Sequence, residues 1–418
     1  MNKTTVCLLG LAVLTGISSG ASADEAINPW RFSAYGSLTY SRDDQDHLGF
    51  VRDLAQAAPR HAGGSLRPDS RMGLQVNYRI NADTEAVMQA VAREKAAATL
   101  GNSIEWAYVA WRPSATWQAR LGRVGADIFL LSDYRNLGYA QTTVRPNWEF
   151  YGFLPIYTVD GGDLTYKFDD NAVRWSLKAQ AGRTGANVPV VGGDIYRLTA
   201  RNFKNLTLTR ETDQWRIKAG AATMTLDREA PFSALTNELV GVAANPAVPA
   251  NIRAEAADYF SEIRFKDVRI NYLTLGAAYD DGLWQAQGEI SKISSGTKIL
   301  IPGVAAYAQV GRRFGQLLPY VGVSGFSPQY AAVQASNNWA PIGASALQAG
   351  AVRALNSTRI DQRTVTLGLR WDFHPLAAAK LQWNRMHVRD NGYGLWETSP
   401  PYTARKVNQL SVGIDWVF

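Results

Sequence analysis

The chain has 418 residues, 46% of them hydrophobic, and a formal net charge of +7. Its mean hydropathy of −0.18 is too polar for a bundle of transmembrane helices, and no run of Lys and Arg resembles a nucleic-acid-binding arm, so no nucleic-acid partner is expected. The 13 Trp and 18 Tyr are many for a soluble enzyme, but aromatic girdles at a membrane interface would use them.

Residues 1–23 have the features of a secretory signal peptide. Lys3 supplies positive charge, residues 6–17 are apolar, and Ala21-Ser22-Ala23 is an A-x-A cleavage site. The sole cysteine, Cys7, lies in this segment, so the exported chain would contain no disulfide. We therefore expect residues 24–418 to form a single domain that closes by other means, such as backbone hydrogen bonds.

After residue 24, stretches of alternating apolar and polar side chains recur along the chain. Many run to about ten residues, the length with which a tilted strand crosses a bilayer. The pattern predicts about sixteen strands, an even number as closed bacterial barrels require, at 30–41, 70–80, 84–94, 102–112, 117–123, 162–168, 172–182, 197–209, 214–227, 266–280, 283–293, 303–314, 318–325, 363–373, 378–388 and 406–418. No segment has the pattern of a long amphipathic helix.

Short and long connections alternate between these strands. The longest are 42–69, 124–161, 228–265 and 326–362; the last two are rich in Ala, Asn and Pro and are predicted as surface loops. Outer-membrane barrels place short turns on the periplasmic side and long loops outside. The sequence therefore predicts an all-β transmembrane antiparallel β-barrel embedded in a lipid bilayer, with the cell outer membrane as its location.

Three motifs resemble the Gram-negative general porins. The terminal strand, 410–418, resembles the last strand of that family; Leu121-Gly122-Arg123 resembles the end of its fifth strand; and 160–166 is similar to the strand that leaves its third loop. The stretch 145–152 departs from the Pro-Glu-Phe-Gly-Gly-Asp-like motif of many such loops. The resemblance implies a homotrimer, a third loop (here 124–161) folded into the lumen, and recognition of the strand ending in Phe418 by the barrel-insertion machinery.

In such porins an electrostatic filter is formed by loop acids that face wall bases across the lumen. The charged residues in or beside the loop are Arg123, Asp127, Asp133, Arg135, Arg145 and Glu149. The inward-facing wall bases are Arg71, Arg79, Arg93, Arg174, Lys178, Arg216, Lys218 and Arg370. A base facing lipid at mid-membrane costs roughly 2–4 kcal/mol, whereas a lumen position costs little. Alternatively, these charged side chains are only solvated in a water-filled lumen. A further alternative is that ion pairs of Arg135 or Arg145 with Asp133 or Glu149 hold the loop in place.

The expected function is passive diffusion of ions and small hydrophilic solutes. Eleven bases against five acids, with Asp372 and Asp415 included, favour weak anion selectivity. No enzyme, cofactor or metal site is expected, because the four histidines, His47, His61, His374 and His387, match neither a Ser/His arrangement nor a metal-ligand spacing.

Three further points remain open in the sequence. A substrate-specific channel, with Tyr35 lining the lumen, and a plugged structural or adhesive barrel share the same strand pattern. A trimer interface would suit the small-residue face of strand 84–94, which carries Ala86, Met88, Ala90 and Ala92.

Overall fold

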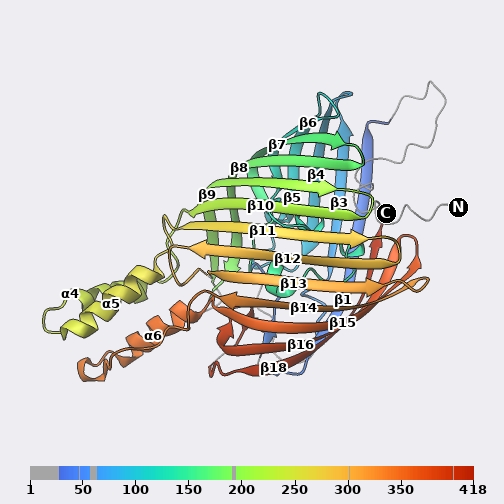
Figure 1. The fold of residues 1–418 in the computed structure, drawn as a ribbon. Helices are drawn as coiled ribbons and strands as arrows, with labels where there is room; N and C mark the ends of the chain where they lie inside the picture. The colour runs from blue at the N-terminus through green and yellow to red at the C-terminus, as the bar shows by residue number, and fades with distance from the viewer. Residues whose placement is uncertain (1–27, 47, 57–63, 191–193, 301, 399) are drawn as a thin grey trace, which may run out of the picture.

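The computed structural model describes residues 28–46, 48–56, 64–190, 194–300, 302–398 and 400–418 (Figure 1). The predicted signal peptide, His47 and His61 lie outside these ranges. Sixteen antiparallel strands form a closed barrel, which confirms the predicted fold. Their bounds are β1 (Trp30–Asp43), β3 (Arg71–Arg79), β4 (Thr84–Arg93), β5 (Ile104–Trp111), β6 (Trp117–Gly125), β7 (Thr158–Asp170), β8 (Val173–Pro189), β9 (Ile195–Glu211), β10 (Trp215–Leu226), β11 (Arg269–Asp280), β12 (Trp284–Ser295), β13 (Gly303–Arg312), β14 (Leu317–Pro328), β15 (Ile360–His374), β16 (Ala377–Tyr393) and β18 (Arg405–Val417).

Each barrel strand pairs with the next barrel strand along the chain, and the last pairs with the first. At this closing seam Tyr35 of β1 lies opposite Val417 of β18, and Ser41 lies opposite Ser411. Closure leaves no unpaired strand edge, which is what a sheet in contact with lipid requires.

Alternation along the strands separates an apolar outer face from an inner face. On β18, Leu410, Val412 and Ile414 point outward and are 47–48% exposed, whereas Gln409 and Ser411 point inward and are buried. The alternation predicted for the strand 406–418 is therefore confirmed. Exposed outward aromatics gather where the strands meet the short turns; they include Trp30, Trp117, Phe168, Trp215, Trp284, Trp371 and Phe418.

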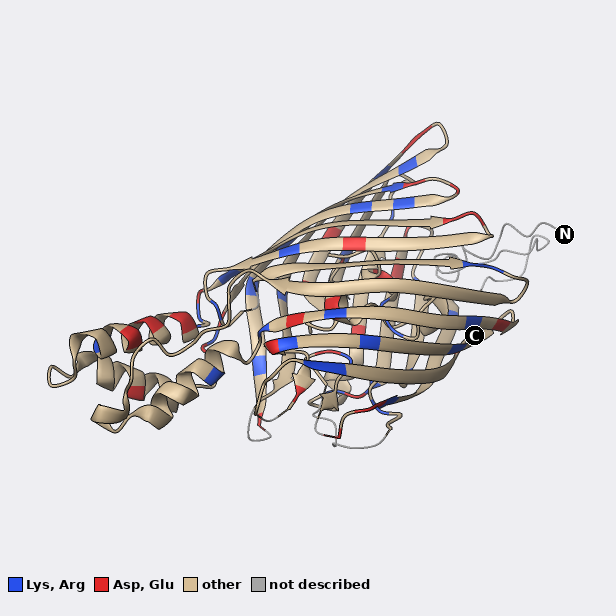
Figure 2. Ribbon diagram, turned by 60° about the horizontal axis from the view of Figure 1, so that its bottom comes forward, with Lys and Arg blue, Asp and Glu red and all other residues tan. Residues whose placement is uncertain are grey.

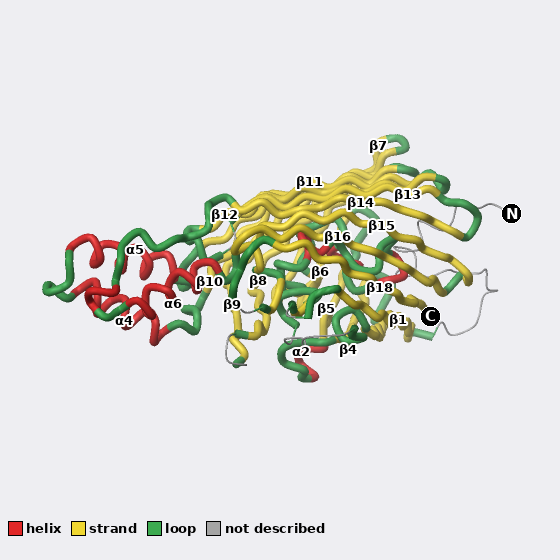
Figure 3. Tube along the Cα trace, turned by 90° about the horizontal axis from the view of Figure 1, so that it is seen from below, coloured by secondary structure: helices red, strands yellow, loops and turns green. Residues whose placement is uncertain are grey.

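The segments predicted as surface loops do connect barrel strands, but they contain helices, which the sequence pattern did not predict. α4 (Ser233–Ala244) and α5 (Ala250–Ile263) connect β10 to β11, and α6 (Ser345–Asn356) lies between β14 and β15. The three helices project from one end of the barrel, opposite the end where β1 begins and β18 ends (Figures 1 and 3). Their Ala-rich sequences favour helix, and their buried residues, such as Leu239, Ala256 and Ala351, fill a small core around Trp339.

A buried carboxylate organises this helical projection. Glu255 of α5 accepts hydrogen bonds from the Tyr259 hydroxyl (2.7 Å), the Ser336 amide (2.7 Å) and the Trp339 indole (2.8 Å). One residue thus joins α5 to the segment that precedes α6.

The remaining elements are short. β2 (Gly49–Phe50) pairs with β17 (Trp396–Glu397), and α2 (Leu100–Ser103), α3 (Trp148–Tyr151) and three 3-10 turns lie in loops. The 3-10 turns are η1 (Ser132–Tyr134), η2 (Gly138–Ala140) and η3 (Ala340–Ile342). Among the described residues, no helix combines the length and apolar character needed to cross a membrane.

Candidate constriction site

Loop three, residues 126–157 between β6 and β7, folds into the barrel lumen. Wall side chains donate to its backbone carbonyls: Arg370 to Tyr139 and Gln141 (2.8 Å each), and Lys380 to Gly138 (2.7 Å). The irregular stretches of a buried loop need such partners for their backbone groups. The inward bases of β15 and β16 therefore hold the loop in place.

Asp127 sits directly against two wall bases. Its carboxylate lies 2.6 Å from the Lys178 ammonium of β8 and also binds Lys218 of β10. Asp133 approaches Lys178 at 3.8 Å. These four predicted residues come together, but as a contact cluster that fastens the loop to the wall rather than as charges facing each other across an open gap.

Arg145 fastens loop three to the closing seam of the barrel. Its guanidinium donates to the carboxylate of Asp69 in loop one (2.6 Å) and to the hydroxyls of Ser41 on β1 (2.8 Å) and Ser411 on β18 (2.7 Å). The predicted pairing with Asp133 or Glu149 is wrong. Both Arg145 and Asp69 are buried, so each supplies the charge that the other needs in a site away from water.

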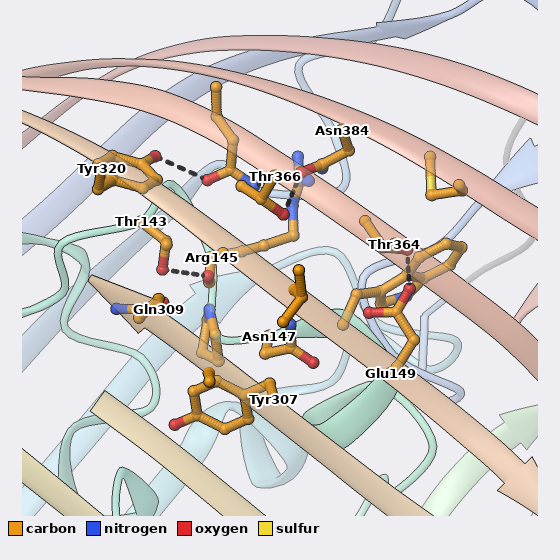
Figure 4. A pocket seen from close by; sticks show the side chains of 17 residues that line it. Thr143, Arg145, Asn147, Glu149, Tyr307, Gln309, Tyr320, Thr364, Thr366 and Asn384 are labelled. Atoms are coloured by element: carbon orange, nitrogen blue, oxygen red, sulfur yellow. Dashed lines mark hydrogen bonds between the residues drawn. The ribbon is translucent and has the colours of Figure 1, made fainter. Parts of the chain in front are cut away.

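Glu149, on α3, binds neutral donors rather than bases. Its carboxylate accepts hydrogen bonds from Ser324 of β14 (2.7 Å) and from Gln362 (2.5 Å) and Thr364 of β15. Figure 4 shows Glu149 beside Thr364, while the Arg145 side chain runs among Thr366 and Asn384. The carboxylate is thus satisfied without facing a base across the lumen.

Arg135 also lacks the acidic partner that was predicted for it. The guanidinium donates to the carbonyls of Tyr151, Leu154 (2.8 Å) and Ile156 (3.3 Å), and it stacks 3.9 Å from the centre of the Tyr157 ring. It therefore folds the second half of loop three back on the first.

Glu289 is an anchor of loop three that was not predicted, as are Lys380 and Asp69. Glu289 of β12 accepts hydrogen bonds from the hydroxyls of Tyr151 in loop three and Tyr307 on β13 (2.6 Å), and from the Leu130 amide (2.8 Å). Glu289 occupies an inward position of the predicted strand 283–293, so the alternation of that strand could have identified it.

Apolar side chains surround these polar anchors. Phe129 and Phe150 of loop three are 2% and 0% exposed, and their rings lie 5.1 Å apart. Phe129 contacts Tyr272 on β11, and Phe153 contacts Phe326 on β14, with ring centres 6.3 and 5.4 Å apart. The lumen at this level is therefore packed with apolar side chains, unlike the polar constriction that the resemblance implied.

Arg123 does not face the lumen, so its predicted place in the constriction is wrong. It lies on the same face of β6 as Leu121, which is 75% exposed, and it pairs with Asp160 at 2.6 Å. The alternation Trp117, Ala119, Leu121, Arg123 carries this information, because Trp117 is an outward aromatic. Only the resemblance to the porin motif implied a place for Arg123 in the constriction.

Two further predicted wall bases, Arg71 and Arg79, differ from each other in their surroundings. Arg71 is buried and donates to the carbonyls of Asn136 in loop three (2.6 Å) and Asp69 (2.8 Å). Arg79 is exposed at the turn end of β3, away from these anchors. Arg71 thus belongs with the loop-three anchors, and Arg79 does not.

Several lumen carboxylates are each shared by two bases. Glu85 lies 3.0 Å from both Arg31 and Arg112, and Asp372 lies 2.6 Å from Arg313 and 2.7 Å from Arg370. Asp127, with its two lysines, repeats the arrangement. Figure 2 shows Lys, Arg, Asp and Glu bands along the barrel strands. The Glu85 and Asp372 groups each carry a surplus positive charge, whereas Asp133 balances the charge of the Asp127 group.

A small cavity lies between loop three and strands β13 to β16 (Figure 4). Besides Arg145 and Glu149, its lining consists of neutral residues, among them Asn147, Gln309 and Tyr320. Within the part of the chain that the structure describes, no three His, Cys, Asp or Glu side chains are grouped so as to hold a metal ion.

No family model matches the sequence, and no curated protein matches it. Solved structures do match. The anion-selective porin from Comamonas acidovorans has a TM-score of 0.51 and 12% identity, covering 93% of this chain and 100% of that one. OmpF of Salmonella typhi, in complex with daunomycin, has a TM-score of 0.51 and 10% identity, with 93% and 97% covered. OprB of Pseudomonas putida has a TM-score of 0.50 and 9% identity, with 94% of each chain covered. The chain therefore has the fold of the Gram-negative outer-membrane porins.

Proposed function

We propose that this protein is an outer-membrane channel for ions and small hydrophilic solutes, with its conductance set by loop three. The observation that carries the proposal is the charged inner wall of the turn-side half of the barrel, where residues such as Arg31, Glu85, Arg174 and Asp372 point inward. A barrel interior that only had to be filled would hold apolar side chains. Charged side chains there indicate a water-filled passage.

Weak anion selectivity is part of this proposal. Lumen carboxylates shared by two bases leave an excess of positive charge along the passage. Fixed charge on the walls of a low-dielectric pore raises the local concentration of the opposite ion. The solved anion-selective porin of similar fold is in accord with this, although the fold alone does not determine selectivity.

Planar-bilayer recording of the purified, folded protein tests both parts of the proposal. We expect discrete conductance steps and, in a salt gradient, a reversal potential of the sign given by anion flow. Conductance with a cation preference would contradict the proposed anion selectivity, but the proposal of a channel would stand. Folded protein without any conductance would overturn the channel itself.

A plugged structural barrel is the second candidate, and the packing of loop three favours it. Phe129, Phe150 and Phe153 join the wall aromatics in one apolar cluster that extends to the helical projection. Such packing is typical of a protein core rather than of a solute path. The same recording distinguishes the two candidates, because a permanently plugged barrel conducts nothing.

We also propose a homotrimer that associates through the outer face of β4. Met88 is 48% exposed there, and the neighbouring outward residues Ala86, Ala90 and Ala92 are small, so a second wall could approach closely. Replacing Ala90 by Trp should turn a slowly migrating trimer into a monomer on unheated gels. Migration as a monomer by the unmodified protein would contradict the proposal.

Export and insertion complete the proposed function. Residues 1–23 would direct the chain out of the cytoplasm and be removed, and the terminal strand ending in Phe418 would be recognised by the insertion machinery. Phe418 is 73% exposed at the turn end of the barrel, where a binding partner could reach it. N-terminal sequencing of the mature protein tests the cleavage after Ala23.

A further inference from the structure

Two helices of the helical projection run directly into barrel strands. α5 continues through residues 264–268 into β11, and α6 continues through residues 357–359 into β15. The helices extend beyond the ends of these strands at the loop side of the barrel (Figure 1). A connection of so few residues leaves little slack, because each residue spans at most about 3.6 Å. A displacement of either helix therefore moves the end of the strand that follows it.

β11 holds the first part of loop three. The Thr274 hydroxyl donates a hydrogen bond to the Ile128 carbonyl (3.1 Å), and the Tyr272 ring lies 6.3 Å from the ring of Phe129. Ile128 and Phe129 are 1% and 2% exposed. The strand that α5 enters is thus in direct contact with the buried start of the loop.

β15 holds the second part of loop three in a similar way. Gln362, which lies close to the start of this strand, donates to the Glu149 carboxylate at 2.5 Å, and Thr364 donates to the same group. Glu149 belongs to α3 and is 1% exposed. The strand that α6 enters therefore binds a buried charge of the loop, so a shift of its first residues would move or break this contact.

The connection between β12 and β13 joins these two junctions. The Thr297 hydroxyl donates to the Glu262 carbonyl at the end of α5 (2.5 Å), and the Thr358 hydroxyl, just after α6, donates to the Ile299 carbonyl. Ile299 is fully buried in the hydrophobic cluster that also contains Phe129 of loop three. α5, α6 and the two strand ends consequently form one packed unit, which reaches from the helical projection to loop three.

We propose that the helical projection controls the position of loop three, so that a shift of α5 and α6 outside the barrel changes how loop three docks inside it. Closely packed side chains transmit such a shift as a change between discrete arrangements rather than as a gradual deformation. Because the two junctions are joined, the contacts on β11 and β15 respond together. The coupling is a property of the fold and goes beyond the proposed channel; only its effect on conductance rests on that proposal.

Hydrogen exchange of the full folded chain in detergent micelles tests the coupling. W339A removes a fully buried ring that packs within the helical projection: its indole donates to Glu255, and its ring lies 6.0 Å from that of Tyr259. We expect W339A to accelerate amide exchange in α5 and α6 and also in loop three, there on the order of ten-fold, the size of a typical coupling between two sites. V240A is the matched control, because Val240 on α4 is 44% exposed, and it should leave exchange in loop three unchanged. Faster exchange in α5 and α6 of W339A without a change in loop three would overturn the proposal.

An engineered disulfide tests the same coupling without loosening the fold, and it decides the test if W339A does not migrate as a folded barrel on unheated gels. The Asn251 side chain of α5 donates to the Asn337 side chain, in the segment before α6, at 2.6 Å. Oxidation of N251C/N337C should therefore fasten α5 to that segment; the one native cysteine, Cys7, lies in the predicted signal peptide. Exchange in loop three should be slower in the oxidised form than in the reduced form. Equal exchange in loop three, with α5 slowed by oxidation, would contradict the proposal.

Planar-bilayer recording of the same variants links the coupling to conductance. Mean conductance should be higher in W339A than in V240A, because loop three docks less firmly, and lower in oxidised N251C/N337C than in its reduced form. Absence of conductance in every form would count against the proposed channel alone, since hydrogen exchange decides the coupling without it.

Discussion

The buried pair of Arg145 and Asp69 shows how single residues define the constriction. Neither side chain is more than 3% exposed, and together with Ser41 and Ser411 they form a closed hydrogen-bonded group. The sequence indicated that Arg145 belonged to loop three, but not its partner, because Asp69 is 76 residues away in a different loop. Pairings of this kind depend on how two loops meet in space.

Replacing Arg145 by Met should release loop three. Asp69 would remain buried without a counter-charge, a change that typically costs about 3–5 kcal/mol. We expect faster hydrogen exchange of the loop-three amides and larger, noisier conductance steps. The double variant R145M/D69L removes both charges and should exchange more slowly than R145M. Equal exchange in the two variants would contradict this account.

Glu255 gives the helical projection a dependence on pH. Burial raises the pKa of its carboxyl, but hydrogen bonds from Tyr259, the Ser336 amide and Trp339 outweigh burial and hold the pKa below the ordinary 4.5. A pKa depressed by folding contributes stability that is present above pH 4.5 and is lost as the pH falls below it.

We therefore expect the projection to loosen in acid while the barrel stays intact. Tryptophan fluorescence of the buried Trp339 should change below pH 4.5, and hydrogen exchange in α5 should accelerate. E255Q removes the titrating group and should show no such pH dependence. An acid transition of the same size in E255Q would contradict the assignment of this pH dependence to Glu255.

At the scale of elements, strands were predictable and helices were not. A lipid-facing strand must alternate along its whole length, so β3, β15 and β18 show the pattern in sequence with few exceptions. α4 and α5 bury their apolar residues mainly against each other and α6, and small alanines suffice for that contact. Their segments therefore lack the strong apolar stripe that marks a helix packed on a large core.

Loop three is an element whose docking can be changed without opening the barrel. Phe150 is fully buried, so F150A should weaken docking by about 3–5 kcal/mol through the cavity it leaves. Mean conductance should rise, with heat-modifiable gel migration unchanged. F168A, on the outer wall where Phe168 is 41% exposed, should leave conductance as it is. A rise in both variants would point to a general loosening of the barrel.

At the scale of the whole molecule, the ion selectivity of the proposed channel would depend on the sum of charges in the lumen. Reversing Arg112 and Arg313 to Glu converts two base-rich groups into acid-rich ones, because Glu85 and Asp372 remain. The reversal potential should then shift towards cations. K204E makes the same kind of change on the outer wall, where Lys204 is exposed, and should leave the potential unchanged. An unaltered potential in the lumen variant would show that the ions pass elsewhere.

The seam between β1 and β18 has a consequence for the order of assembly. Ser41 and Ser411, which Arg145 bridges, are 370 residues apart in the chain. Bringing such distant segments together costs more chain entropy than any pairing of neighbouring hairpins, so closure should be a late step of folding. Arg145 cannot bind both serines before that step. Docking of loop three should therefore follow closure of the barrel, because loop three can reach its final place in the lumen only once the wall around it is complete.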